Sequence, residues 1–172
     1  MIEQPDKLNN QAILLASDGA YKEAIACFKR AIILQKNNYL LWYNLGITYR
    51  DAGQLKEAQN ALATAYSISP ENMDVEETYA TVALMNKNYD LVRTLCEEGL
   101  DFNPLHSHLW NLLGVADFQT GDFQGASEYF EQAVYINPYY VDALYNLMDT
   151  YSELKNEKGQ QECAARIKEL SR

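Results

Sequence analysis

The side chains best able to bind a metal ion or act as a nucleophile are few, and their spacing keeps them apart. His106 and His108 are the only histidines; two residues apart, they point to different faces of a helix or lie in an exposed turn, where His108 could contact a ligand. Cys27, Cys96 and Cys163 are odd in number and never form a Cys-x-x-Cys pair. We therefore predict no metal site, no cofactor and no disulfide framework, and expect the cysteines to be buried as small apolar side chains.

The carboxylates and glycines give no better case for an enzyme. Glu76 and Glu77 are adjacent in the sequence, as are Glu97 and Glu98, so we expect solvated helix faces rather than convergent acids. The sequence contains no phosphate-binding Gly-x-x-x-x-Gly-Lys loop, no dinucleotide-binding Gly-x-Gly-x-x-Gly turn, no Gly-x-Ser-x-Gly nucleophile elbow and no His-Glu-x-x-His zinc motif. The sequence predicts that the protein is not an enzyme.

Charge and hydropathy narrow the range of partners. The 172 residues include 14 Lys and Arg against 24 Asp and Glu, a net charge of -10, which is the wrong sign for neutralising phosphates. The first residues lack the basic start and apolar run of a secretory signal, and no stretch reaches the roughly 18 apolar residues that a membrane span needs. We expect a soluble cytoplasmic protein that binds no nucleic acid and does not insert into membranes.

A 34-residue period organises the chain and predicts where its helices lie. Pro70, Pro104 and Pro138 are 34 residues apart, and Trp42 recurs two periods later as Trp110. Three further columns keep the same interval: Ala24, Ala58, Val92 and Ala126; Phe28, Leu62, Cys96 and Phe130; Ala31, Ala65, Gly99 and Ala133. Several columns at one spacing, without insertions, indicate a tandem repeat.

These columns resemble the tetratricopeptide-repeat family, whose pattern has Trp, Leu, Gly and Tyr in a first helix, then Ala, an aromatic residue, Ala and a Pro. Residues 39–72 follow the pattern throughout, with Trp42, Leu45, Gly46, Tyr49, Ala58, Leu62, Ala65 and Pro70. The resemblance implies an all-α fold, a right-handed α-α superhelix (solenoid) of antiparallel helix pairs. The predicted repeats are 5–38, 39–72, a degenerate 73–106, 107–140, and a partial fifth repeat with a C-terminal capping helix at 141–172.

The residue types within one repeat explain why it folds as a helix pair. Trp42, Leu45, Gly46 and Tyr49 are spaced by three and four, which places them on one face of a helix. Gly53 lies where the chain must turn, and glycine adopts a positive φ at little cost. A lone helix pair cannot bury both of its apolar faces, so we expect neighbouring repeats to stabilise one another.

Asp117 is the clearest departure from the pattern, because it occupies the column in which a large aromatic residue is expected. A buried carboxylate is unfavourable unless it accepts hydrogen bonds. A nearby tyrosine hydroxyl could donate one, so we predict a structural hydrogen bond rather than a catalytic role, and we expect Asp117→Tyr to preserve or raise the melting temperature.

The family resemblance also implies a binding surface. In tetratricopeptide repeats the first helix of each pair, the A helix, lines a concave groove, and its second, fifth, ninth, twelfth and thirteenth positions point into that groove. With the neighbouring sixth position added, the residues predicted to bind a peptide are Tyr43, Asn44, Ile47, Arg50, Asp74, Glu77, Thr81, His108, Asn111, Phe118, Tyr145, Asn146 and Asp149.

The predicted groove carries more acids than bases. Its five main positions in each repeat hold seven acids against the single base Arg50: Asp6, Asp51, Asp74, Glu77, Asp142, Asp149 and Glu153. This excess is either a chance clustering or an acidic field that attracts a basic, or mixed basic and apolar, protein segment. In the second case Tyr43, Phe118 and Tyr145 would supply the apolar contacts.

Three asparagines have two interpretations that the sequence leaves open. Asn44 and Asn146 share the sixth helix position, and Asn111 lies one place earlier in its own repeat. An amide both donates and accepts, so these side chains could hold a peptide backbone. They could equally be ordinary residues of the repeat.

The predicted function is a non-catalytic scaffold that binds a peptide segment of a partner protein. Family members that hold the acidic tails of heat-shock chaperones need a clamp of Lys, Asn, Asn, Lys and Arg, and only Asn44 agrees here, so we do not expect that ligand. The alternative is self-association as a homodimer through weakly matched terminal repeats and the tyrosines of the C-terminal third: Tyr135, Tyr139, Tyr140, Tyr145 and Tyr151.

Overall fold

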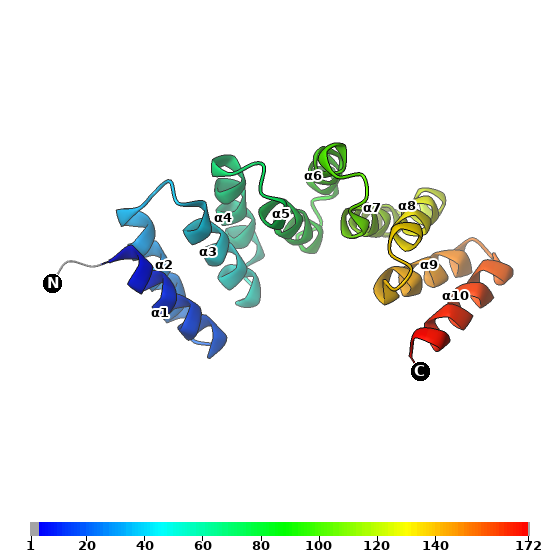
Figure 1. Cartoon of the computed structure of the whole chain (residues 1–172), viewed down its shortest axis with the longest axis horizontal. Helices are drawn as coiled ribbons and strands as arrows, with labels where there is room; N and C mark the ends of the chain where they lie inside the picture. The colour runs from blue at the N-terminus through cyan, green and yellow to red at the C-terminus, as the bar shows by residue number, and fades with distance from the viewer. Residues whose placement is uncertain (1–3, 172) are drawn as a thin grey trace. The chain divides into compact units, whose positions relative to one another are not determined.

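The structure, a computed structural model, describes residues 4–171 and consists of α-helices joined by short turns in that range (Figure 1). Residues 1–3, part of the start that predicts no export, and Arg172, the end of the predicted fifth repeat, lie outside the described residues. The all-α prediction is confirmed. The helices are α1 (Pro5–Ser17), α2 (Tyr21–Leu34), α3 (Tyr39–Asp51), α4 (Leu55–Ile68), α5 (Met73–Met85), α6 (Tyr89–Phe102), α7 (Ser107–Thr120), α8 (Phe123–Ile136), α9 (Val141–Glu153) and α10 (Glu157–Leu170).

The helices form two compact units, Met1–Lys87 and Asn88–Arg172. In the first unit each helix from α1 to α5 packs against the next one along the chain. In the second unit α6 to α10 pack in the same way. Figure 1 shows α1 beside α2 in blue and α9 beside α10 in orange and red. The odd-numbered helices are called A helices below, and the even-numbered ones B helices.

The turn between an A helix and its B helix contains a left-handed residue in every pair. Glycine holds this place at Gly19, Gly53 and Gly121, with φ of 78°, 74° and 86°. Lys87 and Lys155 take the same place with φ of 58° and 57°, a conformation that costs a residue with a Cβ about 1 kcal/mol. Although only Gly53 stood out in the sequence, the backbone needs this turn at every 34-residue interval.

Small residues let the two helices of a pair approach closely. A Cβ on Gly46 would lie 2.6 Å from Cγ of Leu62, and a Cβ on Gly114 would lie 2.6 Å from Cε1 of Phe130. Leu62 and Phe130 are 0% and 1% exposed, so each fills the space that the glycine leaves. The repeat therefore pairs a missing side chain on the A helix with a large one on the B helix.

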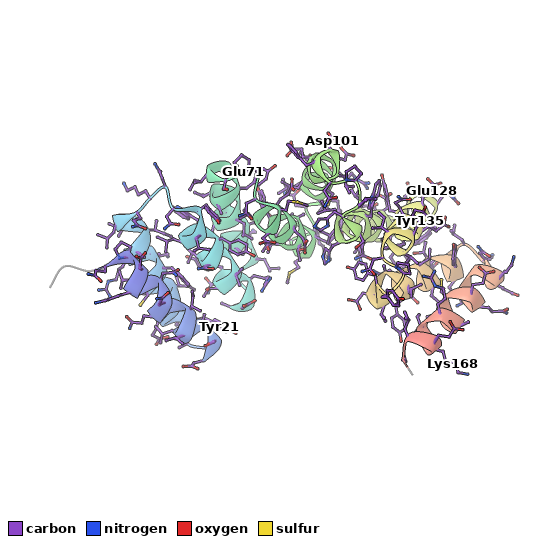
Figure 2. The ribbon with its side chains drawn as sticks, in the orientation of Figure 1. Tyr21, Glu71, Asp101, Glu128, Tyr135 and Lys168 are labelled. Atoms are coloured by element: carbon purple, nitrogen blue, oxygen red, sulfur yellow. The ribbon has the colours of Figure 1, made fainter. Side chains whose placement is uncertain are left out.

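The cysteines and the last helix complete this core. Cys27, Cys96 and Cys163 are 7%, 0% and 4% exposed, which confirms that they are buried small side chains. The last helix, α10, buries only Gly159, Cys163 and Ile167. Its other described side chains are partly or fully exposed, among them Lys168, which Figure 2 labels.

Asp117 on α7 is buried and hydrogen-bonded, as predicted, but its donor is an arginine and not the tyrosine that the sequence suggested. Its Oδ1 accepts a hydrogen bond from Nη1 of Arg93 on α6, and no tyrosine hydroxyl from residues 4–171 donates to it. The hydrogen bond from Arg93 to Asp117 raises the pKa of the guanidinium, so Arg93 stays charged. The other oxygen, Oδ2, lies 2.5 Å from where a Cβ on Gly125 would stand, so glycine leaves it room. The expectation for Asp117→Tyr therefore no longer follows, because tyrosine would remove the carboxylate from this ion pair.

Glu76 also departs from its sequence prediction. We expected a solvated helix face, but Glu76 is 4% exposed, and Oη of Tyr66 on α4 donates to its Oε1 at 3.5 Å. The reason is its register, because Glu76 occupies the repeat position that holds Trp42 and Trp110 in other pairs. Glu97 and Glu98 are exposed, as predicted.

The unequal exposure of the Arg93–Asp117 pair leads to a stability prediction. The side chain of Asp117 is 6% exposed and that of Arg93 is 35% exposed, so losing the arginine strands a buried carboxylate. We expect Arg93→Met to lower the free energy of unfolding by about 3 kcal/mol, and we expect adding Asp117→Asn to recover more than half of that loss. Urea unfolding followed by circular dichroism measures both. A double variant as unstable as Arg93→Met alone would contradict the assignment.

Candidate functional site

The predicted binding residues lie on the A helices of both units. Seven are on α3 and α5 in the first unit: Tyr43, Asn44, Ile47, Arg50, Asp74, Glu77 and Thr81. Six are on α7 and α9 in the second unit: His108, Asn111, Phe118, Tyr145, Asn146 and Asp149. Twelve of these side chains are partly or fully exposed, and Asn111 is buried, with 7% exposed. Each unit therefore presents its own set of these residues.

Hydrogen bonds link neighbouring A helices through these positions. Asn44 Nδ2 donates to Asn9 Oδ1 at 3.1 Å, and Asn146 Nδ2 donates to Asn111 Oδ1 at 2.9 Å. At the equivalent place between α3 and α5, the hydroxyls of Tyr43 and Thr78 are 3.2 Å apart.

The three contacts share one spacing in the sequence. A side chain at the fifth position of one A helix meets the sixth position of the next, 35 residues later. Asn9 and Thr78 were not among the predicted site residues, and this 35-residue interval between polar side chains was the signal that could have found them. Because the Nδ2 groups of Asn44 and Asn146 bond to the preceding A helix, these amides hold the helices together. Their Oδ1 atoms stay available to a ligand.

The two histidines are half-buried, not the exposed turn residues that the sequence suggested. Nδ1 of His108 and the hydroxyl of Tyr140 are 3.1 Å apart. Their rings stack with centroids 5.9 Å apart and an interplanar angle of 21°. His108 therefore fastens the start of α7 to the turn before α9.

The charge of the two units differs. Residues 1–87 hold 10 acids and 8 bases, a net charge of -2, whereas residues 88–172 hold 14 acids and 6 bases, a net charge of -8. In the first unit the one predicted basic residue, Arg50, is already paired with Asp51 at 2.9 Å.

The negative field of the second unit has a simple origin. Residues 94–154, which include α7, α8 and α9, contain ten acids and not one Lys or Arg. On α9, the carboxylates of Asp142, Asp149 and Glu153 form no ion pair or side-chain hydrogen bond with any residue from 4 to 171. These charges are therefore compensated only by solvent.

A half-open cavity of about 120 Å³ lies between α7 and α9 and is called the α7–α9 pocket below. It is lined by Val115, Phe118 and Gln119 from α7, Phe130 from α8, and Asn146 and Asp149 from α9. Phe118, Asn146 and Asp149 are predicted site residues that the fold brings together. Val115 and Gln119 occupy groove positions of the same register, so sequence reasoning could reach them, whereas Phe130 is a core residue.

A larger apolar cavity lies between the B helices of the first unit. It has a volume of about 540 Å³, and Lys29 at its edge has Nζ 5.7 Å from the ring centroid of Tyr49. Its apolar lining is Ile32, Ile33, Trp42, Leu45, Tyr49 and Ala61. The sequence did not indicate this cavity, because three of these residues, Trp42, Leu45 and Tyr49, belong to the repeat pattern and were expected to pack in the core.

The equivalent cavity of the second unit, 102 residues later in the chain, is smaller, at about 260 Å³. Tyr151 spans it, with its Oη donating to Oε1 of Glu131 at 2.8 Å. Burial, followed by the hydrogen bond to Glu131, raises the pKa of Tyr151, so the hydroxyl remains a donor at neutral pH.

Residues 4–171 contain neither a metal-binding cluster nor a membrane-spanning helix. No three His, Cys, Asp or Glu side chains in this range are placed to hold a metal ion together. None of the helices in this range combines the length and the apolar character that crossing a bilayer requires.

The asparagine contacts between α7 and α9 lead to a second stability prediction. Asn111 is buried, and Asn146 is the donor to its carbonyl oxygen, so Asn146→Ala leaves a buried acceptor unsatisfied. We expect a loss of about 1 to 2 kcal/mol in the free energy of unfolding. Asn44→Ala is the matched control, because its acceptor Asn9 is half-exposed and can bond to water, and we expect it to cost less. Equal losses for the two variants would refute this explanation.

Family models described as tetratricopeptide repeat match residues 27–60, 49–115 and 107–140. A stretch of 59 residues is 44% identical to the uncharacterized protein ycf37 of Pyropia yezoensis, over 34% of this chain and 33% of that protein. The BBSome complex member bbs-4 of Caenorhabditis elegans is 24% identical over 72% of this chain and 27% of its own length. The chain thus spans only about a quarter to a third of these relatives.

Solved structures resemble the chain along nearly its whole length. MamA from Desulfovibrio magneticus RS-1 matches with a TM-score of 0.87 at 20% identity, over 99% of this chain and 97% of that one. YrrB, described as a TPR protein with an unusual peptide-binding site, matches with a TM-score of 0.73 at 22% identity, over 95% and 84%. These matches confirm the predicted all-α repeat fold. With the three family models, they show that the chain belongs to the tetratricopeptide-repeat family, whose helix-pair repeats are scaffolds for protein interaction.

Proposed function

We propose that the protein is a non-catalytic scaffold whose second unit binds a basic, or mixed basic and apolar, segment of a partner protein along α7 and α9. The uncompensated acids of α9 carry this proposal, because Asp142, Asp149 and Glu153 lie on the predicted groove positions with no cation on α7, α8 or α9. A field of one sign attracts the opposite charge and speeds association. Phe118 and Tyr145 add apolar contacts on the same helices.

The first unit has a proposed acidic surface of its own, formed by Asp74 and Glu77 on α5, with Tyr43, Ile47 and Thr81 as its less polar members. The ion pair between Arg50 and Asp51 lowers its net field, so we place the stronger binding on the second unit. We also propose that the chain is divided into the five repeats predicted from the sequence, at residues 5–38, 39–72, 73–106, 107–140 and 141–172.

Two of the similar proteins are consistent with such a role. YrrB carries a peptide-binding site according to its description, and bbs-4 is a member of a complex. Both descriptions concern those proteins, and for this chain they support binding to another protein as the class of function.

Exposed aromatic side chains favour a second candidate function, self-association. Tyr135 and Tyr139 in the second unit are 80% and 76% exposed, and Figure 2 labels Tyr135 on α8. Tyr145 is 48% exposed, Tyr140 is half-buried against His108, and Tyr151 is half-buried and bonded to Glu131. The surface available to a second copy therefore centres on Tyr135 and Tyr139.

The acidic-groove proposal predicts a salt-sensitive interaction. The probe is a fluorescein-labelled peptide in which lysine alternates with alanine, measured by fluorescence anisotropy. We expect binding that weakens as the salt concentration rises from 0.05 to 0.5 M, because added salt screens exposed charges. We expect Asp142→Lys with Glu153→Lys to weaken it by about tenfold, the order that several surface charge contacts supply together.

The matched control reverses two exposed acids on B helices, Asp101→Lys with Glu128→Lys, both labelled in Figure 2. This control changes the net charge by the same amount as Asp142→Lys with Glu153→Lys, so we expect it to weaken peptide binding by less than about threefold. If both double variants weaken the peptide equally, the whole-protein charge is responsible and the groove is not. If the peptide does not bind the unaltered protein, the proposal fails.

The self-association candidate predicts a molar mass that depends on concentration. Light scattering should give more than the 19.6 kDa of one chain as concentration rises, because burying apolar side chains favours association. Tyr135→Ser with Tyr139→Ser should return the mass to that of a monomer, whereas Tyr145→Ser on α9 should not. A mass of 19.6 kDa at every concentration would exclude this candidate.

A further inference from the structure

The α7–α9 pocket has the size of a site for one side chain, not for a peptide segment. Its volume is about 120 Å³, and cavities of about 150 Å³ in other proteins hold a benzene-sized group. Val115 and Phe118 form an apolar wall, and Phe130, 1% exposed, closes the pocket from α8. These side chains suit an unbranched apolar stem.

The two aromatic side chains of the pocket, Phe118 and Phe130, are held in place by their neighbours. The ring of Phe118 packs edge to face on Phe123, with centroids 5.2 Å apart and an interplanar angle of 68°. Phe130 lies against the surface left open by Gly114. A preformed wall lowers the entropy that a ligand must pay on binding.

The polar groups of the pocket are acceptors. Nδ2 of Asn146 donates to Asn111, which leaves Oδ1 of Asn146 as its available oxygen. Asp149 contributes a carboxylate and Gln119 an amide oxygen, and neither side chain bonds to another residue in the range 4–171. Carboxylate and amide oxygens around an apolar wall match a cation at the end of an apolar stem.

The three helices that line the pocket supply no such cation. Every helix that lines it belongs to residues 94–154, which contain no Lys or Arg. The negative charge of Asp149 therefore has no partner on α7, α8 or α9, and a ligand can provide it.

We propose that the α7–α9 pocket is a specificity pocket for a single lysine side chain of the bound segment, an inference that rests on the proposed function. The ammonium group has three donors, and Asp149, Asn146 and Gln119 supply three acceptors. An arginine would place five donors in a planar fork, which a small pocket with one carboxylate satisfies less completely. The Phe118 and Phe130 rings add attraction to a cation.

The test uses isotope-labelled full-length protein and nuclear magnetic resonance. The probes are Nα-acetyl-lysine N-methylamide, the norleucine analogue with the same stem and no charge, and the arginine analogue. We expect the lysine probe at millimolar concentrations to shift the side-chain amide signals of Gln119 and Asn146 and the backbone signal of Asp149. We expect the norleucine and arginine probes to bind at least fivefold more weakly.

A pair of variants separates the pocket from the general field of α9. Asp149→Asn keeps the shape of an exposed side chain and removes its charge, so we expect at least a tenfold loss of lysine-probe affinity. Asp142→Asn removes one charge from the same helix outside the pocket, and we expect less than a twofold loss. Unshifted signals elsewhere in the spectrum show that both variants are folded.

Each contrary outcome overturns the inference. An absence of shifts at Gln119, Asn146 and Asp149 removes the site, equal binding of norleucine removes the role of charge, and stronger binding of arginine removes the assignment to lysine. Equal losses for Asp149→Asn and Asp142→Asn assign the binding to the field of α9.

The lysine-alanine peptide and the single-residue lysine probe together distinguish this inference from the proposed function. If the lysine-alanine peptide binds and depends on Asp142 and Glu153 but not on Asp149, the scaffold function stands and the pocket fails. If the single-residue lysine probe binds at the pocket but the peptide does not bind, the pocket stands and the scaffold function fails.

Discussion

The close approach of two helices within each repeat is the constraint on which the rest of the structure depends. Gly46 and Gly114 omit a side chain where Leu62 and Phe130 supply a large one, so each A helix settles directly on its B helix. A helix pair still has apolar surface on its other sides, and the next pair covers it. The contacts between consecutive pairs in each unit follow from this requirement.

That packing fixes the separation of neighbouring A helices, and the separation has chemical consequences. Side chains at the fifth and sixth positions of consecutive A helices come within hydrogen-bonding distance, as Asn111 and Asn146 do. The amide that ties α9 to α7 also turns its remaining oxygen into a ligand group. In the proposed function, stability and binding thus use the same side chain, and the α7–α9 pocket lies beside this hydrogen bond.

The repeat pattern does not determine where the charges lie, because it constrains only the columns of small and large apolar residues. The repeat does not constrain its exposed positions, and residues 94–154 contain ten acids and no Lys or Arg. Where a charge enters a constrained column, it needs a specific partner. Asp117 has Arg93, and the hydroxyl of Tyr66 bonds to Glu76. Outside these columns, the carboxylates of Asp142, Asp149 and Glu153 on α9 face only solvent, or a ligand.

The sequence by itself determined the 34-residue period, the all-α fold and the burial of the cysteines, because regular apolar spacing and small residues act through local geometry. It also placed Phe118, Asn146 and Asp149 on helices with a common register. Only the tertiary structure decided which side chains meet across helices. Arg93 reaches Asp117 from the preceding helix, Tyr66 reaches Glu76, and Asn146 bonds to Asn111, because such contacts depend on the distance and rotation between packed helices, which no local spacing encodes.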